Sequence, residues 1–359
     1  MTQTSKILLS VLFLTGISLG VFSFLRANSS AQVEPVQAQE AVRENQSEAR
    51  ATFGVVGDIM LSRNVAAKIK KANNPLLPFS GMKDVLQTND FNFGNLESPF
   101  SGKDSFPNTG SLVFNVPRQN VKGLVENKFK MISLANNHAM DQGAKALAYT
   151  RTFLGQNNIK AIGAGSNLDE AWKAEVVAAN SIKIGFIAVS YASINDNGKT
   201  TNQLVARIED IKRLKNAIIS ARQQSDFVVV SMHAGTEYKY KPNEAQTKFA
   251  RAVIDLGADM VVGHHPHWVQ TIEKYNGKYI FYSLGNFIFD QEWSRETKEG
   301  LMLKVELAKA GKDGVMKTRL DKIELLPVVV ENYSTPRLAN EKESIVILNH
   351  IGVKNRVLR

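Results

Sequence analysis

The chain has 359 residues, a hydrophobic fraction of 43% and a formal net charge of +10. It contains no cysteine, which excludes disulfide scaffolds, thiolate metal sites and cysteine nucleophiles, so any metal must be held by His, Asp, Glu or Asn. The positive charge favours an anionic partner such as an acidic polymer or phospholipid head groups, or it only keeps the surface soluble. No short cluster of Lys and Arg with interleaved aromatic residues stands out, so we expect no nucleic-acid partner.

The first predicted element is the apolar segment at residues 7–25, which follows Lys6 and carries no charge before Arg26. A segment of this length, at about 1.5 Å per residue, nearly spans a bilayer core of about 30 Å. We therefore predict a signal anchor at residues 1–26, a single pass through the cell membrane and a domain outside the cytoplasm. The alternative is a signal peptide cleaved near Ser29-Ser30-Ala31, which would release a secreted protein.

Residues 27–51 are predicted to form a flexible polar linker, because they are rich in Gln, Glu, Ser and Ala and poor in large apolar groups. One domain is then expected to cover residues 52–359. Within it, short apolar runs alternate with amphipathic stretches. Strands are predicted at 52–57, 90–94, 130–134, 182–189, 227–232, 260–262 and 278–283, and helices at 62–72, 142–157 and 207–224.

Continuous apolar runs separated by helices favour an α/β fold in which helices cover both faces of a sheet. Toward the end of the chain, residues 301–307 and 323–330 alternate between apolar and polar, which is typical of antiparallel strands. Residues 341–352 are expected to close the domain as a helix.

Polar residues follow several predicted strands at the points where the strands end. These residues are Asp58, Glu97, Asn137, His138, His233, His264, His265 and His267. In open α/β sheets, ligand sites lie outside the carboxyl ends of the strands, so these side chains are expected to converge. Carboxylates, imidazoles and amide oxygens suit Mn, Fe and Zn, and two such cations can clamp a phosphoryl oxygen. The sequence therefore predicts a metal site.

Each of these residues has a plainer interpretation by itself. Asp58 could cap a helix, Glu97 could lie in a solvated turn, and Asn137-His138 could begin a helix. His233 could be a hydrogen-bonded core histidine, and His265-Pro266-His267 could be a proline turn with exposed imidazoles. Taken together, the residues favour the metal site.

Seven ordered motifs resemble the CapA family, which is linked to poly-γ-glutamate capsule synthesis and belongs to the metallophosphatase-like, calcineurin-type superfamily. The motifs are GDIML (57–61), NLESP (95–99), LANNHAMDQG (134–143), GAGSNLDEA (163–171), HAGTEY (233–238), GHHPHWVQ (263–270) and YSLGNFIFD (282–290). The resemblance covers about residues 52–352. It implies two packed mixed sheets flanked by helices, a four-layer αββα sandwich of metallophosphatase-like type.

The resemblance also implies roles for the strand-end residues and divalent metal ions as cofactors, Mn, Fe, Zn or Mg. Asp58 is similar to the carboxylate that opens the site, Glu97 to a bridging Asp, Asn137 to the amide-oxygen ligand, His138 to the neighbouring catalytic acid, His233 to the single-histidine ligand, and His265 and His267 to the closing histidine pair. The family pattern is Gly-x-His-Pro-His, so His264 stands at a variable position. It is left out of the ligand set and given a packing or supporting role.

The sequence departs from the phosphoesterase pattern at its opening motif. Met60 stands where these enzymes carry a histidine, which would leave one metal without an imidazole and leaves open a site that holds a single metal. Glu97 also has a longer arm than the usual Asp. Glu237, four residues after His233, could compensate or could be an ordinary surface Glu. Asn286 in the LGNF segment is a weaker candidate for substrate contact.

Three functions follow as hypotheses. The first is a membrane-anchored, metal-dependent hydrolase or transferase that acts on a phosphoester or γ-glutamyl substrate, with His138 protonating the leaving group. The second is a non-catalytic accessory or polymer-binding subunit of a complex that synthesises or exports an anionic polymer. The third is a degenerate phosphatase fold that only binds other proteins.

Overall fold

The computed structural model describes residues 48–191, 203–312 and 315–359. The predicted signal anchor at residues 1–26 lies outside these residues, as does most of the predicted linker. Among the helices in the described ranges, none combines the length and the apolar character needed to cross a membrane. Strand β1 (Ala49–Ile59) begins three residues before the expected domain start, because residues 49–51 pair with residues 307–309 of a long neighbouring strand.

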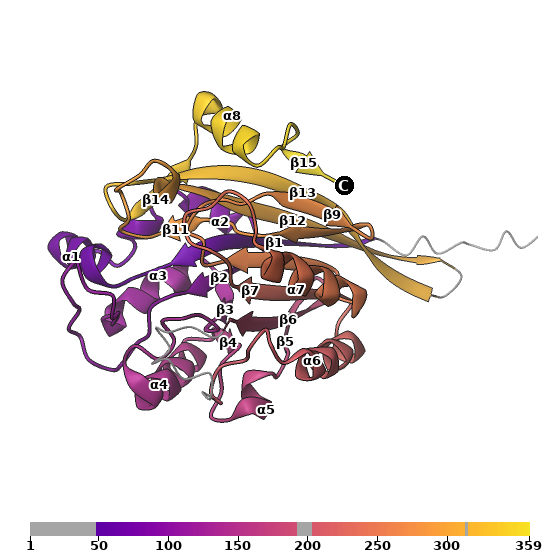
Figure 1. The fold of residues 1–359 in the computed structure, drawn as a ribbon, viewed down its shortest axis with the longest axis horizontal. Helices are drawn as coiled ribbons and strands as arrows, with labels where there is room; N and C mark the ends of the chain where they lie inside the picture. Colours follow the sequence, from indigo (N-terminus) through magenta and orange to yellow (C-terminus); the bar gives the residue numbers. More distant parts are fainter. Residues whose placement is uncertain (1–47, 192–202, 313–314) are drawn as a thin grey trace, which may run out of the picture. The chain divides into compact units, whose positions relative to one another are not determined.

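The first sheet joins a parallel half to an antiparallel half (Figure 1). The parallel half runs in the order β1, β2 (Phe91–Leu96), β3 (Phe129–Ser133) and β4 (Lys160–Ile162). On the other side of β1 lie the antiparallel strands β12 (Glu299–Lys312), β13 (Val315–Glu331) and β14 (Thr335–Leu338). Two short strands complete it, β11 (Asn286–Ile288) parallel to β1 and β15 (Val357–Leu358) antiparallel to β13.

The second sheet has a parallel centre with an antiparallel strand at each edge. Its order is β5 (Glu175–Ala179), β6 (Ile182–Ser190), β7 (Phe227–His233), β8 (Met260–His264), β10 (Lys278–Phe281) and β9 (Ile272–Tyr275). Strands β6, β7, β8 and β10 are mutually parallel. Buried residues dominate these central strands, as the continuous apolar runs of the sequence predict.

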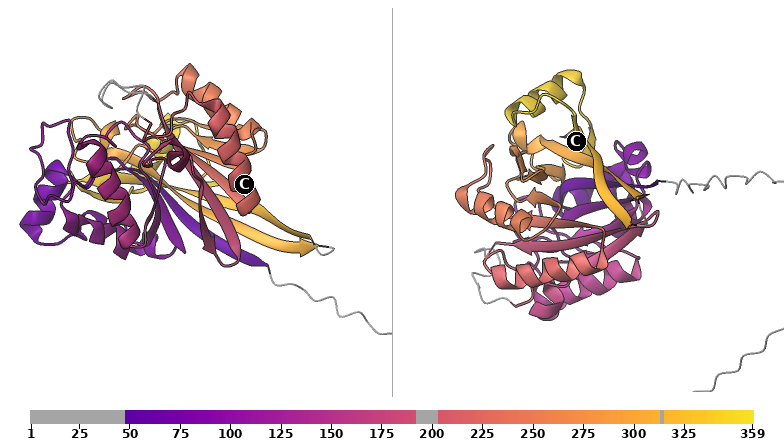
Figure 2. Two further views of the ribbon diagram at one scale, coloured as in Figure 1. Left: turned by 90° about the horizontal axis from the view of Figure 1, so that it is seen from below. Right: turned by 90° about the vertical axis from the view of Figure 1, so that its right-hand side faces the viewer.

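Aromatic side chains fill the space between the two sheets. Phe53 of β1 stacks on Phe91 of β2 with ring centroids 5.4 Å apart, and Phe186 of β6 meets both rings edge-on. Phe93 stacks on Phe186 at 5.1 Å. These contacts fix the two sheets face to face, and Figure 2 shows the packed strands from two further directions.

Helices cover the outer sides of the sheet pair. They are α1 (Arg63–Ala72), α2 (Lys83–Gln87), α3 (Val121–Glu126), α4 (Gly143–Gln156), α5 (Leu168–Ala171), α6 (Ile211–Gln224), α7 (Glu244–Asp255) and α8 (Glu341–His350), with short 3-10 turns η1 (Leu77–Phe79), η2 (Arg118–Asn120) and η3 (Glu296–Lys298). Helices α6 and α7 pack on the second sheet through a separate apolar cluster. Helices α2, α3 and α4 contact β2, β3 and β4, and α8 contacts β13. The four-layer αββα sandwich is confirmed.

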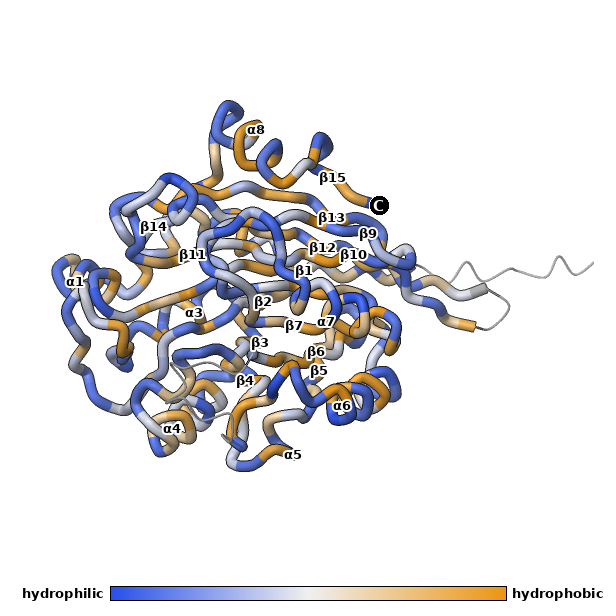
Figure 3. Tube along the Cα trace, in the orientation of Figure 1, coloured by the Kyte–Doolittle hydropathy of each residue, from blue (hydrophilic) through white to orange (hydrophobic). Residues whose placement is uncertain are grey.

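Helix α6, on the second sheet, shows why the amphipathic segments of the sequence fold as helices. In α6 the buried residues Leu214, Ala217, Ile218 and Ala221 recur at intervals of three and four, so one face is apolar. Hydrophobic and hydrophilic residues accordingly alternate along α6 in Figure 3. Asp210 begins this helix by accepting a hydrogen bond from the backbone N–H of Arg213.

Gly57 allows the main chain of β11 to approach β1 closely. A Cβ atom at position 57 would lie 2.0 Å from the carbonyl oxygen of Gly285. The next residue, Asp58, donates its N–H to that same oxygen at 3.0 Å and is paired with Asn286 in the register of the two strands. The glycine therefore places Asp58 next to Asn286.

We expect the substitution Gly57→Ala to lower the free energy of unfolding by about 1–3 kcal/mol, because the methyl group forces β1 and β11 apart. Urea denaturation followed by circular dichroism measures this change. Gly155→Ala is the matched control, since nothing lies within 4 Å of its added Cβ in α4. That substitution should instead raise stability by about 0.5–1 kcal/mol. Equal effects at both positions would contradict the close-approach argument.

Candidate metal centre

The strand ends converge as the sequence predicts. In the first sheet, Asp58 of β1 is in register with Asn95 of β2, two residues before Glu97. In the second sheet, His233 of β7 is in register with His264 of β8. The predicted ligands and the predicted acid are all buried: Asp58, Glu97, Asn137, His138, His233, His265 and His267. Donors from both sheets thus meet at one edge of the sandwich.

Two groups of side chains are arranged to hold a cation. In one, ligand atoms of Asp58, Glu97 and His267 lie within 4.8 Å of one another, and in the other the same holds for Glu97, His233 and His265. Glu97 belongs to both groups. A carboxylate shared by two groups is the arrangement that a pair of divalent cations requires.

Asn137 lies next to the second group. Its Oδ1 is 2.8 Å from Nε2 of His233, so an amide oxygen and an imidazole nitrogen face each other. Asn95 supports the same ring, with Nδ2 3.3 Å from His233 Nδ1, and donates a hydrogen bond to Asp58 Oδ1 at 2.8 Å. Asn95 therefore connects both groups. No role is predicted for Asn95 from the sequence, although its spacing of two from Glu97 on an extended segment puts both side chains on one face.

The Glu97 carboxylate has no hydrogen-bond partner among the described residues, although Nε2 of His233 lies 3.7 Å from its Oε1. Both of its oxygens are buried, and neither makes a hydrogen bond to any described residue. Burial raises the pKa of Glu97 well above its usual value, and the charges of Asp58, Glu237 and Asp141 act in the same direction. A buried charged group without a partner is costly, and a bound cation removes that cost. The donor set therefore fits a divalent metal.

The imidazoles of the second group, those of His233 and His265, are also suited to binding a divalent metal. Burial lowers the pKa of His265 to about 3 and lowers the pKa of His233 well below its usual value. Both rings are thus neutral at pH 7 and keep a lone pair for a metal. His265 and His267 adopt left-handed backbone conformations, with φ of 98° and 57°. Such conformations are costly for residues other than glycine and cluster at functional sites.

His264 lies close to the site but belongs to neither group. Its ring is completely buried, with Nδ1 3.4 Å from Asp58 Oδ1, and it meets Phe93 edge-on at 6.3 Å. The neighbouring imidazoles of His264 and His267 outweigh the effect of burial and hold the pKa of Asp58 below its usual value. This position agrees with the supporting role expected for His264.

Asn286 supports a predicted ligand. Its Oδ1 lies 2.9 Å from His267 Nδ1, and its Nδ2 donates to the carbonyl of Thr297 at 2.8 Å. The amide orientation is thereby fixed, so His267 Nδ1–H donates to Asn286 and Nε2 is left facing Glu97 Oε1 at 4.0 Å. Asn286 thus orients His267.

We expect Asn286→Ala to weaken metal binding by about 10- to 100-fold, because His267 loses the partner that fixes its ring. Titration of the metal-free protein with Zn²⁺, followed by calorimetry, measures the change. Asn216→Ala on α6, an exposed asparagine outside the site, should leave the affinity unchanged. Unchanged affinity in both variants would contradict the supporting role of Asn286.

Met60 and Glu237, the two residues that depart from or could complete the expected ligand set, both lie near the site. Met60 is completely buried, and its Sδ accepts a hydrogen bond from the backbone N–H of Ser62 at 3.1 Å. The first group nevertheless contains the imidazole of His267, so neither group lacks an imidazole, contrary to what the sequence pattern predicts. Glu237 is half-buried and acts on Glu97 through its charge, but it belongs to neither group.

His138 is held beside the two groups by a carboxylate and an aromatic ring. Its Nδ1 lies 2.9 Å from Asp141 Oδ2, and its Nε2 lies 3.9 Å from Glu97 Oε1. The ring of Phe114 stacks on the imidazole at 4.1 Å, and Asp141 Oδ2 also accepts the N–H of Phe114. Asp141 was missed in the sequence, where the His-x-x-Asp spacing of LANNHAMDQG was the available signal.

Arg63 and Asp290 form a buried ion pair near His138. The Arg63 guanidinium lies over the ring of Phe114 at 4.8 Å from its centroid, and Asp290 also accepts the N–H of Asn64. Arg63 has a positive φ of 43°, which is unusual for a residue with a side chain. No sequence pattern indicates this pair, because its members lie in motifs far apart along the chain.

Comparison with known proteins shows which family the chain is similar to. The family described as "Bacterial capsule synthesis protein PGA_cap" matches residues 52–291. A PGA biosynthesis protein CapA of Bacillus subtilis is 34% identical over 284 residues, which cover 78% of this chain and 73% of that protein. A Mycobacterium tuberculosis protein named "Probable polyglutamine synthesis accessory protein" is 28% identical over 209 residues, 55% of each chain.

One solved structure is also similar to the chain. The 5'-nucleotidase precursor from Thermus thermophilus is 15% identical, with a TM-score of 0.44, over 84% of this chain and 57% of that one.

Proposed function

The chain belongs to the bacterial capsule synthesis protein family PGA_cap, and from that membership we propose that it is a metal-dependent hydrolase or transferase in the synthesis of an anionic capsule polymer. The observation that carries the proposal is the buried Glu97 carboxylate, which lacks a hydrogen-bond partner among the described residues and is shared by two groups of candidate ligands. A phosphoester or γ-glutamyl bond is the proposed point of attack.

The ligand residues would be Asp58, Glu97 and His267 for one cation and Glu97, Asn137, His233 and His265 for the other. Divalent cations held there would polarise the substrate oxygen and lower the pKa of an attacking water. His138 would hold a proton at Nε2, the ring atom that faces Glu97, and pass it to the leaving group. Asp141 keeps the ring in that orientation through Nδ1.

Metal analysis and activity assays test this proposal together. The purified full-length protein should retain about two divalent ions per chain. After loading with Mn²⁺, Fe²⁺, Zn²⁺ or Mg²⁺, it should hydrolyse bis-p-nitrophenyl phosphate or γ-glutamyl p-nitroanilide, and EDTA should stop the reaction. A metal-free protein, or a fully loaded one that is inactive on both substrates, would contradict the hydrolase.

Met60 favours a second candidate, a non-catalytic subunit that binds the polymer within a synthesis or export complex. The buried thioether stands where an imidazole would complete the first cation's ligands, and sulfur of this kind suits hard divalent metals poorly. In this case the protein would bind metal and polyglutamate without turnover. The substitution Met60→His separates the candidates, since gain of hydrolysis only in this variant would indicate that the natural site is non-catalytic.

We also propose that residues 1–26 anchor the protein in the cell membrane with the domain outside the cytoplasm. The apolar run at residues 7–25 supports this placement. Cell fractionation tests it: the full-length chain should sediment with membranes and be digested by protease added to intact protoplasts. A chain found in the medium and shortened by about 30 residues would instead show cleavage and secretion.

A further inference from the structure

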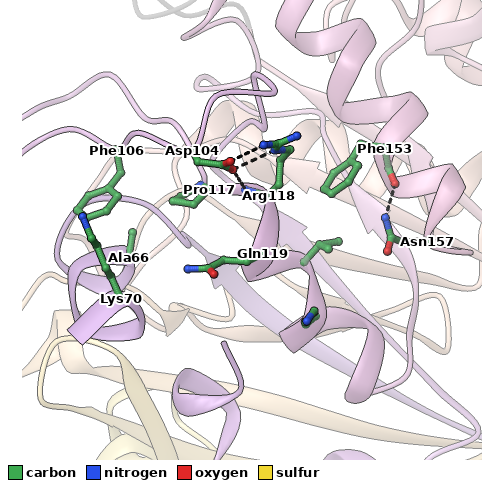
Figure 4. Close-up of a pocket in the computed structure, with 11 residues that line it drawn as sticks. Ala66, Lys70, Asp104, Phe106, Pro117, Arg118, Gln119, Phe153 and Asn157 are labelled. Atoms are coloured by element: carbon green, nitrogen blue, oxygen red, sulfur yellow. Dashed lines mark hydrogen bonds and ion pairs between the residues drawn. The ribbon is translucent and has the colours of Figure 1, made fainter. Parts of the chain in front are cut away.

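A groove of about 690 Å³ lies outside the metal centre (Figure 4). Helix α1, the loop after Glu97, the turn η2, helix α3 and the end of α4 form its walls. None of the proposed metal ligands lines it.

The groove carries excess positive charge. Lys70 of α1, Arg118 of η2 and Lys122 of α3 line it together with one carboxylate, Asp104. Arg118 binds that carboxylate through its side chain and its backbone N–H, and the side-chain contact lowers the pKa of Asp104 to about 2. Lys70 and Lys122 are exposed and form no ion pair with the residues that the structure describes. Two ammonium groups are therefore left for a ligand.

The remaining lining is made of amides and apolar groups. Gln119 and Asn157 contribute side-chain amides. The Asn157 amide nitrogen donates to the carbonyl of Phe153 at 2.8 Å, so its oxygen stays available as an acceptor. Phe106 and Phe153 supply aromatic surface on either side of the groove in Figure 4. A fitting ligand would combine carboxylates, peptide-like amides and methylene groups.

We propose that this groove binds an extended γ-linked glutamate chain, with free carboxylates on Lys70 and Lys122. Each unit of such a chain has one carboxylate, one amide and two methylenes, which matches the three kinds of surface in the groove. The choice of polymer rests on the proposed function, but the binding requires no hydrolysis.

Helix α1 connects the groove to the metal centre. Arg63, its first residue, acts electrostatically on Glu97, and Lys70 lies seven residues further on. At 1.5 Å per residue this is about 10 Å along the helix axis. A glutamate chain in the groove would therefore be held close to the metal centre without occupying it.

Fluorescence anisotropy with a fluorescein-labelled γ-linked glutamate decamer tests the proposal on the full-length protein in detergent. The double variant Lys70→Glu/Lys122→Glu should raise the Kd by about tenfold or more, equivalent to about 1.4 kcal/mol. The control Lys212→Glu/Lys215→Glu makes the same change of charge at exposed positions on α6. It should change the Kd by less than about twofold, since distant charges are screened by salt.

Three outcomes would overturn the assignment. An equal loss in both double variants would mean that only the net charge attracts the decamer. A polyphosphate of matched charge that binds as tightly, with the same loss in the groove variant, would exclude a carboxylate chain as the specific ligand. Loss of decamer binding in E97Q would indicate that the decamer binds at the candidate metal centre and not in the groove.

Metal content separates this proposal from the proposed function. The groove variant should keep the metal and thermal unfolding temperature of the wild type, which shows that it is folded. E97Q should bind the decamer normally even if it has lost its metal. Failure of the hydrolase proposal would therefore leave decamer binding unchanged, and failure of the groove proposal would leave the metal site unchanged.

Discussion

E97Q is expected to leave the purified protein without bound divalent metal and to lower metal-dependent hydrolysis by about 100-fold or more. Glu97 is the carboxylate that both ligand groups share, so its neutralisation weakens both positions together. Plasma emission spectrometry of the purified variant measures the loss. Retention of one metal per chain would show that one of the two ligand groups holds its cation without Glu97.

In the metal-free protein, E97Q should raise the free energy of unfolding near neutral pH relative to the wild type. Burial raises the pKa of Glu97 in the folded state above its value of about 4.3 in an unfolded chain. Above that pH the unfolded state releases the proton more readily than the folded state, so stability falls as pH rises. Glutamine carries no charge and is free of this dependence.

Urea denaturation of EDTA-treated proteins between pH 4 and pH 8 checks the sign. The free energy of unfolding of the wild type should fall relative to that of E97Q as the pH rises. Comparing the two proteins cancels the contributions of His233 and His265, which both contain. Parallel curves would mean that the Glu97 carboxylate finds a compensating partner even without metal.

H138A is expected to lower kcat by about 100- to 10,000-fold while the metal content stays at the wild-type level. The reason is geometric: Nε2 of His138 faces the ligand Glu97, and Nδ1 is held by Asp141. Hydrolysis of bis-p-nitrophenyl phosphate by the metal-loaded protein measures the change.

D141N is the companion variant for this prediction. It should lower kcat less than H138A, because the imidazole keeps its place but loses the carboxylate that orients it through Nδ1. If H138A instead lost bound metal in proportion to its activity, His138 would be a ligand rather than an acid.

The elements that sequence predicts well are those with an unambiguous pattern. The continuous apolar run that ends in His233 and the one that ends in His264 can only be buried strands in a sheet covered on both faces. Strand β1 extends further back than predicted, because residues 49–51 have little apolar character and are held by pairing with β12. Backbone pairing of that kind leaves no signature in composition.

The site was predictable where a side chain follows a strand end, and not where it depends on packing. Glu97 and His267 follow from strand position and motif resemblance. Asn95, in contrast, lies within a strand, and its contacts to Asp58 and His233 exist only once the two sheets face each other. The Arg63–Asp290 pair joins residues 227 positions apart, so only the folded chain brings them together.

The candidate metal ligands come from both sheets, and this has a mechanical consequence. Asp58, Glu97 and Asn137 belong to one layer, while His233, His265 and His267 belong to the other. A cation bound by residues of both layers would cross-link the two sheets at these strand ends. The aromatic contacts of Phe53 and Phe186 hold the sheets together elsewhere. Removal of the metal by a chelator should therefore favour local opening at the strand ends. Hydrogen exchange should show faster exchange of the amide hydrogens near residues 95–97 and 264–267, while those around Phe53 and Phe186 stay protected.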